Sequence, residues 1–160
     1  MHTISRVVIH PSYTGTLSMR SIYEHNIAVV ILNEAILLNT YQNRIALPRN
    51  EPPNLVTGVT SGWGLNSYSL EQNPGEFAKS DVTILNSFHC TQMLPFLVNN
   101  GQICAIKTNG VSPTDVGGPL VYDQRVVGLL SYVRTSPRSD PGIYTSVHHY
   151  LDFIKSVIAP

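Results

Sequence analysis

The stretch Thr114–Leu120, with the sequence Thr-Asp-Val-Gly-Gly-Pro-Leu, constrains the fold of this chain more than any other segment. Glycine adopts backbone angles that other residues resist, and proline fixes its own φ angle. Gly-Gly-Pro therefore marks a tight turn between strands in many folds, and alone it predicts no more than a turn. The segments around it decide what else the stretch implies.

Size and charge exclude several classes of partner. A chain of 160 residues is long enough for one domain with a sizeable core. Ten Lys and Arg balance ten Asp and Glu, so charge gives no reason to expect nucleic acid or an anionic membrane as a partner. No apolar run approaches the length that crosses a bilayer. The charged fraction of 12% is about half the usual ~25%, and this low charge suits a β-rich exported protein.

Apolar periodicity predicts a chain built mainly of strands. Residues 6–9 form an apolar run before Pro11, and residues 25–32 form a nearly continuous run, typical of a strand buried on both faces. Residues 78–85 read as an alternating strand. Residues 150–158 place apolar side chains on one face of a helix, so we predict a C-terminal α-helix there.

Together these segments resemble the chymotrypsin/trypsin family of serine peptidases. The stretch 114–120 resembles Gly-Asp-Ser-Gly-Gly-Pro-Leu, the family's nucleophile loop. Residues 62–64 are Gly-Trp-Gly, a strong family marker, and residues 141–147 are similar to Pro-Gly-Val-Tyr-Thr-x-Val. The resemblance covers residues 7–158. It implies an all-β fold of the trypsin-like type, a double antiparallel β-barrel with the first barrel incomplete and a C-terminal α-helix.

The same resemblance divides the chain into parts. Residues 1–50 are expected to be a remnant of the first barrel, 51–147 the second barrel and 148–160 the helix, within one truncated peptidase domain. Residues 41–48 resemble a short strand before the crossing between barrels, and the composition of residues 49–54 indicates a linker. Trp63 is expected to fill the core without a catalytic role.

The family's catalytic groups are replaced or missing in this sequence. Val116 stands where the family has its attacking serine, and valine has neither a lone pair nor a proton to give. Asn26 stands where the family's aspartate supports the catalytic histidine, and it is expected instead to satisfy a turn before a strand. Nothing resembles the Ala-Ala-His-Cys segment that carries the base. His25 is expected to be a solvent-facing neighbour.

The resemblance also implies changes around the substrate. Thr114 replaces the glycine of the oxyanion region, and a β-branched residue resists the angles that glycine permits. Gly110 is at the floor of the specificity pocket, so the acid that selects Lys or Arg is missing. Ser131 and Tyr132 belong to the strand on which substrates lie, and Val133 is expected to narrow the pocket mouth.

Two further questions concern Asp115 and other nucleophiles. Asp115 corresponds to an aspartate that pairs with a freed N-terminal amine in active members, so its burial here needs another partner. Ser112, Thr114 and Ser131 are alternative hydroxyls, but none has a base in the sequence to activate it.

Cys90 and Cys104 allow three interpretations from their number alone: free thiols, metal ligands or a disulfide. Cys104 lies in Ile-Cys-Ala, as in the family, and the resemblance implies that the two cysteines bond to each other. Such a loop of about 15 residues contributes about 3 kcal/mol in the chain-entropy model. His148 and His149 are adjacent and point to different faces, which favours a cap or surface role over a metal site. No metal and no other cofactor is expected.

Three classes of function remain. We favour a non-catalytic homologue that binds protein or peptide ligands, as a cofactor or decoy in an extracellular proteolytic cascade. The alternatives are a serine endopeptidase with residual or unusual activity and a truncated product without function. Residues 1–6 have no signal-peptide pattern, which by itself predicts a cytosolic protein, whereas the resemblance implies a secreted one.

Overall fold

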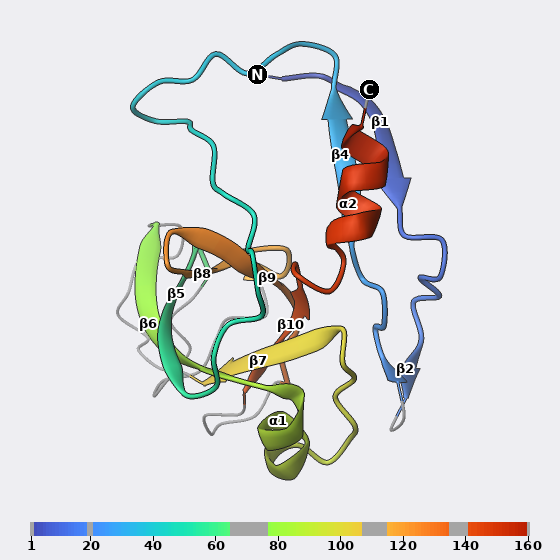
Figure 1. Ribbon diagram of the computed structural model, residues 1–160, viewed down its shortest axis with the longest axis vertical. Coiled ribbons are helices and arrows are strands. Elements are labelled where there is room, and N and C mark those ends of the chain that lie inside the picture. The colour runs from blue at the N-terminus through green and yellow to red at the C-terminus, as the bar shows by residue number, and fades with distance from the viewer. Residues whose placement is uncertain (1, 19–20, 65–76, 107–114, 135–140, 160) are drawn as a thin grey trace.

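The computed structural model describes residues 2–18, 21–64, 77–106, 115–134 and 141–159. Most of its regular structure is β, in a closed barrel, a separate antiparallel ribbon and a short hairpin, with a C-terminal helix (Figure 1). This is the predicted trypsin-like all-β fold.

The barrel closes in the order β10-β7-β6-β5-β8-β9, and each neighbouring pair is antiparallel. Its strands are β5 (Val56–Gly62), β6 (Ala78–Leu85), β7 (Gln102–Ile106), β8 (Pro119–Tyr122), β9 (Arg125–Tyr132) and β10 (Gly142–Ser146). The strand predicted at residues 78–85 is confirmed as β6. Every residue of β10 is buried. This burial fits its sequence, because residues 142–146 include no charged side chain.

Buried apolar side chains fill the barrel. The cluster includes Val82, Ile84, Ile103, Leu120 and Tyr144, contributed by four different strands. Because each strand sends alternate side chains inward, apolar residues two apart in β6 meet the same core. The barrel is therefore a packed support and not a channel.

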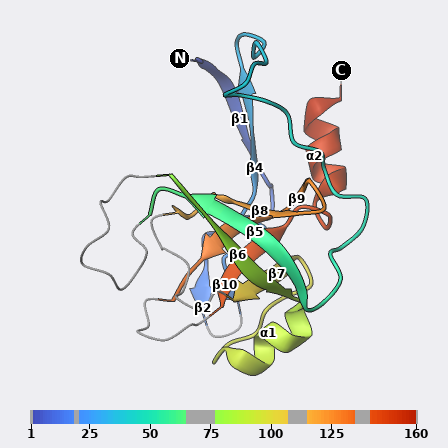
Figure 2. The same ribbon diagram turned by 90° about the vertical axis from the view of Figure 1, so that its left-hand side faces the viewer.

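An antiparallel ribbon stands beside the barrel. It consists of β1 (Ile4–Ile9) and β4 (Ala28–Leu32), and it extends from the barrel in the same direction as the C-terminal helix (Figure 1, Figure 2). Val7 pairs with Val30 in this ribbon, and these side chains are 51% and 49% exposed. The prediction of a strand buried on both faces was therefore wrong for β4, because one face of the ribbon is open.

A short hairpin lies between β1 and β4 in the sequence. It pairs β2 (Leu17–Ser18) with β3 (Ser21–Ile22) in antiparallel register. The carbonyl oxygen of Ile22 accepts a hydrogen bond from the Gln102 side chain at 2.6 Å. This bond connects the hairpin to β7 of the barrel.

The predicted disulfide is confirmed. Cys90 of α1 (Ser87–Met93) bonds to Cys104 of β7, and both cysteines are fully buried. The helix begins after Asn86, whose side chain accepts a hydrogen bond from the backbone N–H of His89 at 3.0 Å. The disulfide therefore fastens a short, capped helix to the wall of the barrel.

The C-terminal helix is also confirmed, as α2 (Leu151–Ile158). Its apolar face fits the pattern from which it was predicted. None of the helices in the described part of the chain is long and apolar enough to cross a membrane.

Two local predictions were wrong. Residues 41–48 do not form a strand: Ala46 makes an isolated parallel bridge to Arg125, and Asn39 makes another to Gln42. Trp63 is not in the core but 63% exposed, and its ring packs on Phe77 at 5.0 Å between centroids. Trp63 follows Gly62, the last residue of β5. The chain leaves the barrel wall at this point, so the Trp63 side chain is not directed into the core.

Candidate functional site

Two positions that the resemblance assigns to the aspartate and the nucleophile of the catalytic site line the same cleft. Asn26 and Val116 are 90 positions apart in the sequence, yet both border a cavity of about 370 Å³ between the N-terminal segments and the barrel. The rest of its wall is mostly apolar and consists of Ile9, Tyr13, Ile27, Ala28, Gly117, Leu129 and Leu130. The assignment of these two positions to the family's catalytic site stays a prediction, and the structure places both beside this cavity.

Asn26 connects the start of β4 to the barrel. Its Nδ2 donates to Ser131 Oγ at 2.9 Å, and its backbone oxygen accepts from Thr145 Oγ1 at 2.9 Å. Ser131 is only 4% exposed, so this contact is well shielded. The turn-satisfying role expected for Asn26 is replaced by cross-links to two barrel strands. A neutral amide in this position supplies no charge to stabilise an imidazolium.

Val116 lies at the turn before β8 and is 54% exposed. The turn is closed by Gly118 N–H, which donates to the Asp115 carbonyl at 2.8 Å, and by Gly117 N–H, which donates to the Leu130 carbonyl at 2.7 Å. Gly117 has φ +91°, a conformation that favours glycine. The turn thus presents position 116 to the cleft, but the group presented is an inert isopropyl.

Asp115 has the partner that the sequence left unnamed. Its Oδ1 accepts hydrogen bonds from the backbone N–H groups of Trp63 at 3.0 Å and of Gly64 at 2.8 Å. Gly62 makes room for it: a Cβ added there would lie 2.2 Å from the carboxylate carbon. The two glycines of Gly-Trp-Gly therefore support the loop that carries Val116. Gly62 leaves space for the Asp115 side chain, and Gly64 donates a hydrogen bond to it.

His25 is not the solvent-facing residue that was expected. Its ring is half-buried and stacks on His10, with centroids 4.8 Å apart and planes at 6°. Its Nδ1 lies 3.1 Å from the Tyr150 hydroxyl. Burial lowers the pKa of His10, and the charges of His25 and His149 lower it further. This cluster joins both strands of the ribbon to the start of α2, and His25 does not line the cleft.

The remaining predicted substrate residues lie at the end of β9. Ser131 is buried, and Tyr132 packs against Tyr23 and Phe96 with centroids 6.1 Å and 5.9 Å apart. Val133 packs against the barrel core. Gly110, Thr114 and Ser112 lie outside the described residues, so the expectations for the pocket floor and the oxyanion region stay predictions.

The histidines near α2 have protein partners. His148 Nδ1 lies 3.4 Å from Glu51 Oε1, and the backbone N–H of His149 donates to Ser146 Oγ at 3.1 Å. Within the part of the chain that the structure describes, no group of three or more His, Cys, Asp or Glu side chains is arranged to hold a metal ion.

Comparison with known proteins gives one consistent result. The profile of the family described as Trypsin matches residues 1–154. Trypsin-3 of Salmo salar is 29% identical over an alignment of 158 positions that covers 96% of this chain and 64% of that protein. Putative trypsin-6 of Homo sapiens is 27% identical over an alignment of 159 positions that covers 97% of this chain and 62% of that protein. Kallikrein-10 of Homo sapiens is 30% identical over an alignment of 162 positions that covers 96% of this chain and 58% of that protein. The chain thus spans less than two thirds of the length of these relatives.

Proposed function

The chain belongs to the trypsin family of serine peptidases, and from that premise we propose that it is a catalytically inactive member that acts by binding a protein or peptide. The observation that carries the proposal is the joint position of Asn26 and Val116 on one cleft. Acyl transfer by this family needs a nucleophile, a base and a group that orients the base. An amide and an isopropyl group supply none of these.

Other hydroxyls near the cleft do not restore the chemistry. Ser131 is buried, and its Oγ accepts the hydrogen bond of the Asn26 amide. A serine attacks a carbonyl only when a base removes its proton. The nearby His25 faces Tyr150 and His10 instead, so the imidazole in this region is engaged elsewhere.

The cleft supports binding in place of turnover. Its wall is mainly apolar, with Ile9, Ile27 and Leu129 among the lining side chains. Val116 enlarges this apolar surface and is more than half exposed. An apolar side chain of a peptide that enters the cleft would gain about 25 cal/mol per Å² of apolar area removed from water. A protein or peptide ligand fits this surface better than an ion.

We further propose that the protein is exported and works outside the cell, as a cofactor or decoy in a proteolytic cascade. The Cys90–Cys104 disulfide supports an oxidising compartment, because structural disulfides are rare where glutathione and thioredoxin keep thiols reduced. Detection of the natural protein in extracellular fluid would agree with this proposal, and detection confined to cytosol would contradict it.

Labelling and cleavage assays test the inactivity. The purified chain is treated with a fluorescent fluorophosphonate and with a mixture of unstructured peptides, with an active trypsin as the positive control. We expect neither labelling nor cleavage, and the same result for Val116→Ser, since a serine without a base is no nucleophile. Labelling of the unaltered chain, or chelator-insensitive cleavage by it, would favour a residual peptidase.

A separate selection experiment tests the binding. Peptides displayed on phage are selected against the chain and then measured with Val116→Trp, which fills the cleft. The matched control is Met93→Trp, at an exposed position of α1. Selected peptides should bind Val116→Trp about tenfold more weakly, as expected when a central apolar contact is blocked, and Met93→Trp normally. Equal affinity for both variants would refute a binding role of the cleft, and the absence of any binder would favour a product without function.

A further inference from the structure

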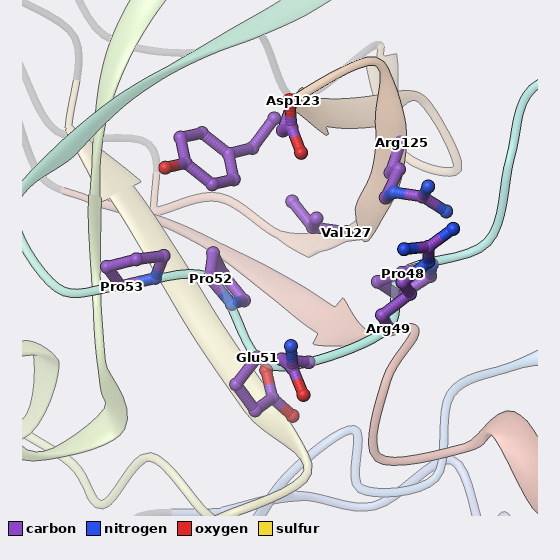
Figure 3. Close-up of a pocket in the computed structure, with 10 residues that line it drawn as sticks. Pro48, Arg49, Glu51, Pro52, Pro53, Asp123, Arg125 and Val127 are labelled. Atoms are coloured by element: carbon purple, nitrogen blue, oxygen red, sulfur yellow. The ribbon is translucent and has the colours of Figure 1, made fainter.

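A second cavity lies away from the cleft, where residues 48–53 cross the hairpin of β8 and β9 (Figure 3). Its volume is about 320 Å³. It shares no lining residue with the cleft that contains Asn26 and Val116. Whatever binds here is therefore independent of the proposed function of the cleft.

The segment before the cavity is fixed to β9 by backbone acceptors. Val126 N–H donates to the Ala46 carbonyl at 3.1 Å, and Arg125 Nη1 donates to the Leu47 carbonyl at 2.7 Å. Pro48 is buried directly after these contacts. The pocket is thus held open by hydrogen bonds and by a residue with a fixed φ angle, which limits the entropy lost when a ligand binds.

The opposite wall is a tight hairpin turn. Asp123 and Gln124 have φ angles of +48° and +56°, the left-handed conformation that such turns require at both central positions. The turn connects Tyr122 of β8 to Arg125 of β9, and both line the cavity. The position of the Arg125 backbone is therefore set by the hairpin, and its side chain by the bond to Leu47.

Two positive charges meet at one end of this cavity. Arg49 comes from the crossing segment and Arg125 from β9, and their guanidinium groups point toward each other (Figure 3). Among the residues that the structure describes, neither guanidinium has a carboxylate oxygen within 4.0 Å. Neighbouring like charges repel, and an anion between them converts that repulsion into attraction.

The acidic side chains of the cavity leave this end free. Glu51 Oε1 accepts from Ser146 Oγ at 2.6 Å and lies 3.4 Å from His148 Nδ1, so its carboxylate is engaged within the protein. In Figure 3, Glu51 lies at the end away from Arg125, and Asp123 lies at the hairpin turn. The charges in the cavity are therefore separated, with the positive end shared by Arg49 and Arg125.

We propose that this cavity binds the carboxylate of an acidic peptide between Arg49 and Arg125. Guanidinium groups match a carboxylate with paired, parallel N–H donors, which gives both affinity and orientation. Pro52 and Tyr122 provide apolar surface for the atoms next to the carboxylate. Asp123 lies at the hairpin turn and Glu51 at the end away from Arg125, so one carboxylate of the peptide enters between the two arginines and the rest of the peptide extends outward into solvent.

Fluorescence anisotropy tests the proposal with two probes of equal length. Fluorescein-labelled, C-terminally amidated tetraglutamate should bind, and the equally labelled and amidated tetraglutamine should not. Arg49→Gln should weaken tetraglutamate binding about tenfold, as the loss of a direct charged contact does, whereas Arg44→Gln should leave it unchanged. Arg44→Gln is the matched control because it removes the same charge from an exposed residue that does not line the cavity.

A third variant separates the effect of the paired guanidinium N–H donors from the effect of the positive charge. Arg125→Lys keeps the charge and removes the paired donors, so it should also weaken binding, with circular dichroism to verify the fold. Equal affinities for Arg49→Gln and Arg44→Gln would overturn the proposal, as would full affinity of Arg125→Lys or binding of tetraglutamine. Because none of these variants alters the cleft, the phage experiment with Val116→Trp can fail or succeed separately.

Discussion

Replacement of Gly62 by alanine should break the contact that fixes the loop carrying Val116. Gly62 has no positive φ angle, so alanine is compatible with its backbone. The added methyl, however, would lie 2.2 Å from the Asp115 carboxylate carbon, well inside the contact distance of ~3.4 Å. The carboxylate must move, and it then loses the N–H groups of Trp63 and Gly64.

The expected cost follows from those two bonds. A hydrogen bond to a charged acceptor contributes about 1.5–3 kcal/mol when shielded from water. Trp63 is 63% exposed, so water replaces part of what is lost, and about 2–4 kcal/mol in total is a reasonable expectation for Gly62→Ala. Asp115→Ala removes the same bonds and should cost a similar amount. In the Asp115→Ala background, Gly62→Ala meets no carboxylate and should cost less than about 0.5 kcal/mol.

Urea unfolding of the four proteins gives the double-mutant cycle. We expect a coupling free energy of about 1.5 kcal/mol or more between positions 62 and 115. The matched control is Gly15→Ala, a glycine with φ +68° that makes no contact with Asp115, and its cost should be the same in both backgrounds. Additive costs at positions 62 and 115, within about 0.5 kcal/mol, would refute the steric reasoning.

The other predictions concern stability. Replacement of Cys90 and Cys104 by alanine should lower the free energy of unfolding by about 3 kcal/mol for the sequence separation of 14, and equal urea midpoints with and without the disulfide would contradict this. The pKa of His10 is lowered in the folded state, so the unfolded chain binds its proton first and stability should fall as pH drops below about 6.5. His10→Gln removes this titrating group, so the free energy of unfolding, measured by urea titration, should depend less on pH in this range. An unchanged pH dependence would contradict the role given to His10. Burial raises the pKa of Tyr144 to about 12, so stability should decline as pH rises above 10, and Tyr144→Phe should reduce that decline.

The barrel and its disulfide were predictable because their signals are local. Alternation in residues 78–85 reports a strand directly, and the Ile-Cys-Ala triplet identified Cys104 with its partner Cys90 through the family resemblance. The family resemblance assigned Asn26 and Val116 to one site through two motifs, and both residues line the same cleft. Their catalytic equivalence to the family's aspartate and nucleophile stays a prediction.

The misplaced residues depend on packing that no single segment encodes. The apolar run of β4 predicts a strand, but not which face has a neighbour, and Val30 is on the open one. Trp63 is a large aromatic residue of the kind that usually fills a core. It is exposed here because it follows the end of β5, and its residue type alone does not indicate that position. His25 and Tyr150 are 125 positions apart, and no spacing rule connects an isolated histidine to a distant tyrosine.

The attachment of Asp115 to Trp63 and Gly64 bears on what fixes the turn around Val116. The family resemblance implies that the corresponding carboxylate of active members pairs with a freed N-terminal amine. Here one oxygen of the same side chain already accepts hydrogen bonds from two main-chain donors of a distant segment. The turn that carries Val116 is therefore held by a contact that needs no such amine.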